Sequence, residues 1–102
     1  MTEAALQQAI IDLARWCGYL HWHDNDSRRN LPGFPDLVLI HTRTGRLIFI
    51  EVKSDKGRLR PKQQVWLELL GIHHEVYVWR PVHWQNETIR RVLTAETRRA
   101  AA

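Results

Sequence analysis

The chain has 102 residues, 44% of them hydrophobic, and a formal net charge of +4 at pH 7. This length predicts a single domain, residues 1–102, with enough apolar side chains for a core of its own. One cysteine excludes an internal disulfide framework, and no apolar run approaches the roughly 18 residues that a membrane-spanning helix needs. We therefore expect a cytoplasmic protein without a membrane partner, and the excess of basic residues favours a polyanionic one.

The first predicted element is a helix over residues 2–17, with Thr2 as its N-cap and Gly18 just past its end. Its apolar residues recur at helical spacing. They are Leu6, Ile10, Leu13 and Cys17, with Ala9 and Trp16 widening the stripe. Glu3 lies on the same face, one turn nearer the N-terminus. This position suits the helix dipole as well as a functional carboxylate.

Three strands are predicted next, over residues 19–23, 36–41 and 46–53. A polar segment that contains Arg28 and Arg29 separates the first two strands, and Thr42–Gly45 forms the turn between the second and the third. The second and third strands therefore form a central β-hairpin. Because both are apolar over most of their length, we expect this hairpin to lie in the middle of the sheet.

A basic loop follows the hairpin and leads to a helix over residues 61–70, where Pro61 suits the first turn. The apolar side of this helix consists of Val65, Trp66, Leu69 and Leu70. A fourth strand is predicted over 76–79 and a last helix over 87–99, with Asn86 as its cap. This order of elements predicts a small α/β sandwich. Most of the tryptophans are expected in the core, and Trp84 is the best candidate for the surface.

Charged residues occupy one common end of the predicted hairpin. Asp36 stands at the start of its first strand, and Glu51 and Lys53 stand at the end of its second. If the turn is centred between Arg43 and Thr44, Asp36 lies directly across from Glu51, with Cβ atoms about 4.5–5.5 Å apart. A shorter turn with a glycine bulge would shift the pairing by one residue and separate the two carboxylates.

Two carboxylates at that spacing repel each other unless a proton or a cation lies between them. Oxygen ligands of this kind suit Mg²⁺ or Mn²⁺. Lys53 points the same way as Glu51, because side chains alternate along a strand, and it supplies a positive charge for a phosphate group. A metal-activated water and a suitably placed cation suffice for phosphodiester hydrolysis. The alternative is an ordinary exposed strand end with a weak Glu–Lys ion pair.

The segments around these residues match a known pattern. Pro35-Asp36, followed by Glu51-Val52-Lys53, matches the Pro-Asp…(Asp/Glu)-x-Lys signature of the restriction-endonuclease-like nucleases. With Gly33-Phe34 before the hairpin and Arg60-Pro61-Lys62-Gln63 at the next helix, the chain resembles the stand-alone members of the VRR-NUC (virus-type replication-repair nuclease) family. The resemblance extends to about Pro81. It implies an α/β fold with a restriction-endonuclease-like core, in which a small mixed sheet with a central β-hairpin is flanked by helices.

The resemblance also implies roles for individual residues. Asp36 and Glu51 resemble the metal-binding carboxylates, and the main-chain carbonyl of Val52 and the carboxylate of Glu3 resemble further ligands of Mg²⁺ or Mn²⁺. Lys53 resembles the catalytic lysine. The active-site glutamine of the family corresponds to Gln63, with Gln64 as its neighbouring alternative.

For the whole chain, the resemblance implies a bacterial or phage endonuclease that acts as a homodimer on branched DNA such as Holliday junctions. We expect basic residues on both sides of the hairpin to contact DNA phosphates. These residues are Arg28, Arg29, Lys56, Arg58, Arg60 and Lys62. A non-catalytic DNA-binding or assembly module, an RNA-cutting nuclease and a sequence-specific DNA nuclease are the alternatives. The intact set of Asp36, Glu51 and Lys53 argues against the first of these.

Overall fold

The computed structural model describes residues 1–23 and 31–95, and the elements in this part of the chain follow the predicted order to the fourth strand. They are α1 (Glu3–Trp16), β1 (Tyr19–His23), β2 (Leu37–His41), β3 (Leu47–Val52), α2 (Pro61–Leu70), β4 (Glu75–Trp79), α3 (Pro81–Gln85) and α4 (Thr88–Thr94). Among the described residues, no helix is long and apolar enough to cross a membrane.

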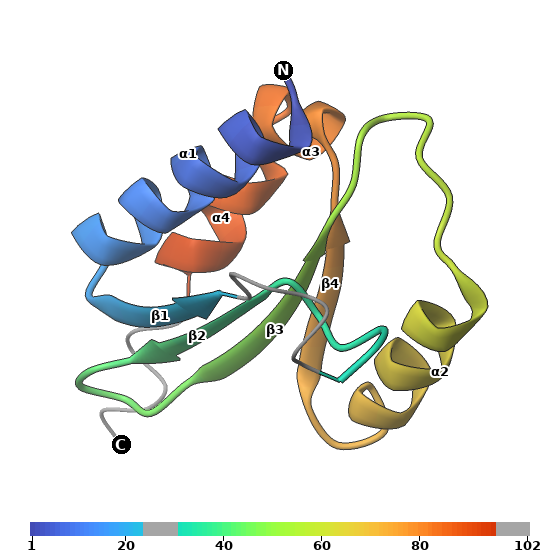
Figure 1. Ribbon diagram of the computed structural model, residues 1–102. Coiled ribbons are helices and arrows are strands. Elements are labelled where there is room, and N and C mark those ends of the chain that lie inside the picture. Colours follow the sequence, from blue (N-terminus) through green and yellow to red (C-terminus); the bar gives the residue numbers. More distant parts are fainter. Residues whose placement is uncertain (24–30, 96–102) are drawn as a thin grey trace.

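The described strands form one sheet in the order β1-β2-β3-β4. β1, β2 and β3 pair antiparallel, whereas β4 pairs parallel with β3, and α2 makes the crossover between these two strands. Figure 1 shows α1 and α4 on one face of the sheet and α2 on the opposite side, beside β4. This small mixed sheet with a central β2–β3 hairpin and flanking helices confirms the predicted fold class.

The core lies between the sheet and the layer formed by α1 and α4. Leu6 and Ile10 of α1 are fully buried, as are Ile48 and Ile50 on alternate positions of β3. α4 contributes Ile89 to the same cluster. Each fully buried side chain of this size contributes about 1.5–3 kcal/mol to stability, so this layer holds α1, and with it Glu3, against the sheet.

Three tryptophans do not lie where the sequence predicted them, and of these Trp22 in β1 is 45% exposed. Trp16 was expected to widen the apolar stripe of α1, but its side chain is 88% exposed. At 3.6 residues per turn Trp16 lies about 120° around the helix from the line of Leu6, Ile10 and Ala14, which is too far to reach the sheet. Trp84 was the expected surface tryptophan, but it is half-buried and packs against the core.

The predicted last helix, residues 87–99, is wrong in its extent. Two short helices occupy this part of the chain, because Pro81 begins α3 and Glu87 has a left-handed backbone with φ of 70° between α3 and α4. Asn86 ends α3 and its side chain accepts a hydrogen bond from the N–H of Thr88, so it does support the start of α4. The predicted end at residue 99 lies outside the described residues.

Helix α2 sits less deeply on the sheet than its pattern predicted, and none of its ten described side chains is buried. Val65 is 54% exposed and Leu69 is 61% exposed. Near the middle of the helix, the indole N–H of Trp66 donates to the carbonyl of Pro32 at 3.1 Å. This anchor fixes the end of α2 that carries Gln63.

The register of the hairpin is the one that the longer turn predicts. Leu37 pairs with Ile50, and Ile40 pairs with Leu47. The N–H of Gly45 donates to the carbonyl of His41, and Gly45 has φ of +74°, a left-handed conformation that glycine adopts without strain. Continuing this pairing by one residue beyond β2 puts Asp36 level with Glu51. The alternative, in which a bulge separates the two carboxylates, is therefore wrong.

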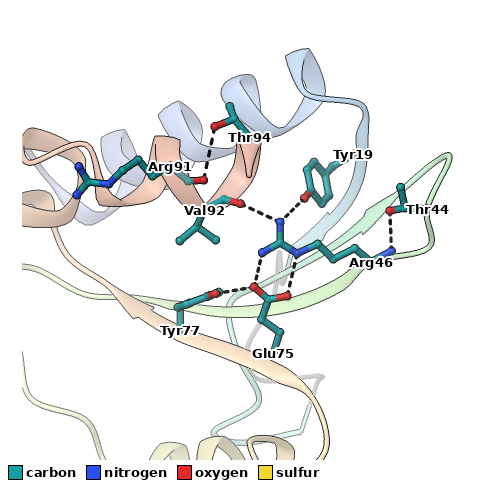
Figure 2. Close-up of polar contacts among 8 residues, drawn as sticks. All are labelled: Tyr19, Thr44, Arg46, Glu75, Tyr77, Arg91, Val92 and Thr94. Atoms are coloured by element: carbon teal, nitrogen blue, oxygen red, sulfur yellow. Dashed lines mark hydrogen bonds and ion pairs between the residues drawn. The ribbon is translucent and has the colours of Figure 1, made fainter. Parts of the chain in front are cut away.

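Arg46, at the opposite end of the hairpin from Asp36, joins several elements on the α4 side of the sheet (Figure 2). Its guanidinium binds both carboxylate oxygens of Glu75 and donates to the hydroxyl of Tyr19 at 3.1 Å and to the carbonyl of Val92 at 2.8 Å. Burial raises the pKa of Glu75, but the hydrogen bonds from Arg46 and Tyr77 outweigh it and lower that pKa. Arg46 thus connects β1, β3, β4 and α4.

We expect Arg46→Gln to lower the free energy of unfolding by about 2–3 kcal/mol, because it leaves partly buried acceptors without their donor. Arg43→Gln, an exposed substitution in the neighbouring turn, should change it by less than about 0.5 kcal/mol. Urea denaturation followed by circular dichroism measures both values. Equal midpoints for the two variants would contradict this role for Arg46.

Candidate active site

Asp36 lies one residue before β2, at the end of the sheet away from the hairpin turn. Its carboxylate oxygen Oδ2 accepts a hydrogen bond from the main-chain N–H of Val52 at 2.9 Å. The preceding Pro35 is buried and donates no N–H. The contact across the strand ends therefore fixes Asp36 against the segment that carries Glu51 and Lys53.

Glu51 is an acidic residue in the interior of the protein, with 1% of its surface exposed. Its oxygen Oε2 accepts a hydrogen bond from the side-chain amide of Gln63 at 3.0 Å. Its other oxygen, Oε1, is buried and has no hydrogen-bond partner among the described residues. A buried carboxylate with one unsatisfied oxygen is costly, so this site favours either a proton or a cation on Glu51.

The surroundings of Glu51 raise its pKa to about 8. Burial is the largest cause, and the nearby carboxyl group of Asp36 adds to it. The positive charge of Lys53 acts in the opposite direction. In the absence of a bound cation the two carboxyl groups thus favour retaining a proton between them, which is the behaviour of a close carboxyl pair.

Lys53 lies on the same face of the strand end as Glu51. Its ammonium Nζ is 3.9 Å from Oε2 of Glu51, and 13% of its side chain is exposed. The main-chain N–H of Lys53 donates to the carbonyl of Trp79 at 3.0 Å, which extends the β3–β4 pairing by one residue. The lysine is therefore held on an ordered strand end and faces the buried carboxylate.

Gln63 comes from the first turn of α2. Its carbonyl oxygen accepts a hydrogen bond from the main-chain N–H of Arg60 at 2.8 Å, which leaves its amide group to donate to Glu51. Gln64, the neighbouring alternative, is exposed. Of the two glutamines, Gln63 is thus the one that contacts the carboxylates.

Glu3 reaches the same end of the sheet from the first turn of α1. Its oxygen Oε2 accepts a hydrogen bond from the main-chain N–H of Ser54 at 3.0 Å. Among the described residues, however, no three acidic, histidine or cysteine side chains are gathered into a group that could hold a metal ion. Glu3 lies beside the residue that follows Lys53 and does not complete a three-carboxylate cluster with Asp36 and Glu51.

A cavity of about 510 Å³ adjoins Asp36 and Gln63. Arg60 and Lys62, both exposed and both predicted to bind DNA, line its rim. One wall depends on Gly33, which has φ of +87°, and a Cβ atom there would lie 2.6 Å from the main chain of Lys62. Only glycine allows this approach, which explains its place in the sequence pattern.

Of the remaining residues predicted to contact DNA, two lie in the described part of the chain. Lys56 and Arg58 are exposed in the loop between β3 and α2. Arg28 and Arg29 lie outside the described residues. The four described basic residues thus flank the carboxylate site from the loop that follows Lys53 and from the start of α2.

Comparison with known proteins decides the family. The model of the VRR-NUC domain matches residues 1–83, which is most of the chain. The chain belongs to the VRR-NUC family. The matched region contains every described residue of the carboxylate site.

Two solved structures share this fold. A VRR-NUC domain structure superposes with a TM-score of 0.71 and 22% sequence identity, over 88% of this chain and 97% of that one. A VRR-NUC domain protein superposes with a TM-score of 0.56 and 20% identity, over 87% of this chain and 90% of that one. A curated relative, the Fanconi-associated nuclease 1 homolog of Caenorhabditis elegans, is 42% identical over 52 residues. Those residues are 48% of this chain, which spans about 6% of the length of that relative.

Phe34, an aromatic residue of the family pattern, has a role that only the packing shows. The ring of Phe34 lies between those of Trp66 and Phe49, with centroids 5.2 and 6.1 Å away at steep angles. This contact seats α2 on the sheet beside the carboxylates.

Arg80, which contacts the segment after Lys53, was not singled out from the sequence, because a lone arginine between a strand and a proline carries no motif.

Proposed function

We propose that this VRR-NUC domain is a divalent-metal-dependent endonuclease that hydrolyses phosphodiester bonds of DNA. The observation that carries the proposal is the carboxyl pair of buried Glu51 and half-buried Asp36, in which Glu51 has an unsatisfied oxygen, lies level with Asp36 and faces Lys53 at 3.9 Å. An ordinary surface Glu–Lys pair would be exposed and weakly coupled. The burial of this pair argues for the functional alternative.

The residues fit a divalent cation. The unsatisfied oxygen of Glu51 and the mutual repulsion of the two carboxyl groups are the features that a bound cation would relieve. Asp36, Glu51 and the main-chain carbonyl of Val52 would hold Mg²⁺ or Mn²⁺. Glu3 would join them only after its carboxylate leaves the N–H of Ser54. When bound, such an ion supplies Lewis acidity toward the phosphate group and lowers the pKa of water.

The protein's own groups would position the substrate and the attacking water. Lys53 orients the water and offsets negative charge as the new bond between oxygen and phosphorus forms and the bond to the leaving oxygen breaks. The proton lost by water passes through solvent to the leaving oxygen. Gln63 holds Glu51 through its amide and keeps the carboxylate aligned, while Lys56, Arg58, Arg60 and Lys62 bind neighbouring phosphates.

For the substrate, we propose branched DNA, including four-way junctions, cut by a homodimer with two active sites. The support is the resemblance to stand-alone VRR-NUC nucleases, together with the small surface that one such domain offers to DNA. The described surface also has apolar area available for a second copy. Leu20 of β1 is 62% exposed and its pairing neighbour Ile40 of β2 is 41% exposed.

The test is cleavage of a labelled four-way junction, a linear duplex of the same sequence and a single strand, each with Mg²⁺, Mn²⁺ or EDTA. We expect symmetric cutting of the junction with either metal, at least tenfold slower cutting of the linear substrates, and none in EDTA. Light scattering after size-exclusion chromatography should give the mass of two chains.

Two results would contradict separate parts of the proposal. Cleavage that persists in EDTA would exclude metal-dependent chemistry. Equal cutting of all three substrates, or a strict monomer at the assay concentration, would exclude paired cutting of branched DNA while leaving the nuclease itself in place.

A further inference from the structure

The segment that follows Lys53, residues 54–57, folds around a single guanidinium group. Nη1 of Arg80 donates to the carbonyl of Ser54 at 2.5 Å and to that of Gly57 at 2.6 Å, with a longer contact to the carbonyl of Asp55 at 3.5 Å. The N–H of Gly57 closes the turn by donating to the carbonyl of Ser54 at 3.2 Å. The carbonyl dipoles of the segment thus converge on one cation.

Arg80 is placed there by the parallel pairing of β3 and β4. Val52 pairs with Trp79, and the N–H of Lys53 donates to the carbonyl of Trp79, so the next residues of the two strands, Ser54 and Arg80, leave the sheet side by side. Figure 1 shows α3 beginning just beyond this end of β4. A second hydrogen bond links the segment to α3, in which Oδ1 of Asp55 accepts from the N–H of Val82 at 3.1 Å.

The remaining contacts leave little freedom for the segment. The carboxylate of Glu3 accepts a hydrogen bond from the N–H of Ser54. A Cβ atom at Gly57 would lie 2.8 Å from the hydroxyl oxygen of Ser54. With the carbonyl groups turned inward onto Arg80, the exposed Lys56 gives the outer side of the turn a positive charge. Such a surface attracts a polyanion, because the dipoles that would repel it are satisfied on the inner side.

We propose that Arg80 is a positioning residue of this nuclease domain. It shapes residues 54–57 so that Lys53 stays beside Glu51 and so that Lys56 and Arg58 face the phosphate backbone of the substrate strand. Arg80 itself does not touch DNA and acts through the segment. The inference rests on the proposed function for its catalytic consequence, whereas its structural part stands on the contacts above.

The first test measures the segment without DNA. Amide hydrogen exchange of Ser54 and Gly57 should accelerate at least tenfold in Arg80→Gln and only partly in Arg80→Lys, which keeps the charge and a smaller set of donors. Arg43→Gln serves as the charge-matched control and Arg46→Gln as the stability-matched control, both at the far end of the hairpin. Protection that survives in Arg80→Gln would overturn the proposal.

The second test measures DNA affinity in EDTA at several salt concentrations, where the slope of log Kd against log salt reports the number of phosphate contacts. Arg80→Gln should reduce this slope by about two, as the double variant Lys56→Gln/Arg58→Gln does, since each lost contact removes roughly 0.9. Adding Arg80→Gln to that double variant should cause no further reduction, because a residue that acts through the segment is not additive with it. Additive effects would show that Arg80 contacts DNA directly and would overturn the proposal.

Cleavage adds a third measurement, since Arg80→Gln should lower the single-turnover rate at saturating protein at least tenfold. If the wild-type protein binds DNA but cuts none, the proposed nuclease function fails while exchange and salt dependence still decide the role of Arg80. If the wild-type protein binds no DNA at all, both proposals fail. Faster exchange in Arg80→Gln with an unchanged salt slope would overturn the link between the segment and DNA.

Discussion

Glu51→Gln is expected to make the metal-free protein more stable than the wild type above pH 8 while abolishing cleavage. The pKa of Glu51 is about 8 in the folded protein and about 4.5 without its surroundings, so the folded state retains a proton that the unfolded state has lost. Wild-type stability therefore falls as pH rises from about 4.5 to about 8. Each pKa unit corresponds to about 1.4 kcal/mol, so the total loss is a few kcal/mol.

The introduced amide can still accept the hydrogen bond from Gln63 but carries no charge to bury. At pH 9 in EDTA we expect its melting temperature to be at least about 10 °C above that of the wild type, and at pH 4 the two should agree closely. Differential scanning calorimetry across this range gives the comparison. A wild-type minus variant difference that does not change with pH would show that Glu51 is not buried as a neutral acid.

The same experiment reports on the metal. A cation that binds the ionised carboxylate stabilises the folded state by mass action and displaces the proton. Mg²⁺ should therefore raise the wild-type melting temperature more at pH 8.5 than at pH 6, and it should have little effect on Glu51→Gln. An equal effect of Mg²⁺ on both proteins would place the ion elsewhere on the molecule.

Lys53→Ala is expected to reduce the rate of DNA cleavage by about 10²- to 10⁴-fold without a matching loss of DNA affinity. The ammonium group lies 3.9 Å from Glu51 and is 87% shielded from solvent, whereas a lysine that serves only as a phosphate contact would be exposed. Its removal should also raise the pKa of Glu51 further, because its charge is the influence that lowers that pKa. Single-turnover cleavage at saturating protein measures the rate.

The matched control is Lys56→Ala, three residues further along the same segment and exposed. We expect that variant to weaken DNA binding and its salt dependence while leaving the rate at saturation within about threefold of the wild type. If Lys53→Ala behaved like Lys56→Ala, Lys53 would be a binding residue and not part of the chemistry. Circular dichroism of each variant confirms that the fold is retained.

Local pattern was sufficient for most of the elements. Continuous apolar runs indicated the two central strands, and Thr2 and Pro61 marked the starts of two helices. Gly45 in a four-residue turn was compatible with the observed hairpin register. The last two helices were predicted as one, because Glu87 carries the left-handed conformation that a glycine or asparagine would have signalled. Glutamate seldom adopts the left-handed conformation, so its presence in the sequence does not predict a helix break.

The candidate site also combines features that the sequence determines with features that only the structure shows. By itself the sequence determined that Glu51 and Lys53 share one face of a strand end, since side chains alternate with a period of two, but it left two hairpin registers open for Asp36. The structure selected the register that puts Asp36 level with Glu51. The tertiary structure decided that Glu51 is buried with an unsatisfied oxygen, that Gln63 rather than Gln64 donates to it, and that Arg80 gathers the segment after Lys53. These facts depend on how α2 and α3 pack against the strand ends, and contacts between residues so far apart in the chain follow from the packing of whole elements, which no local spacing records.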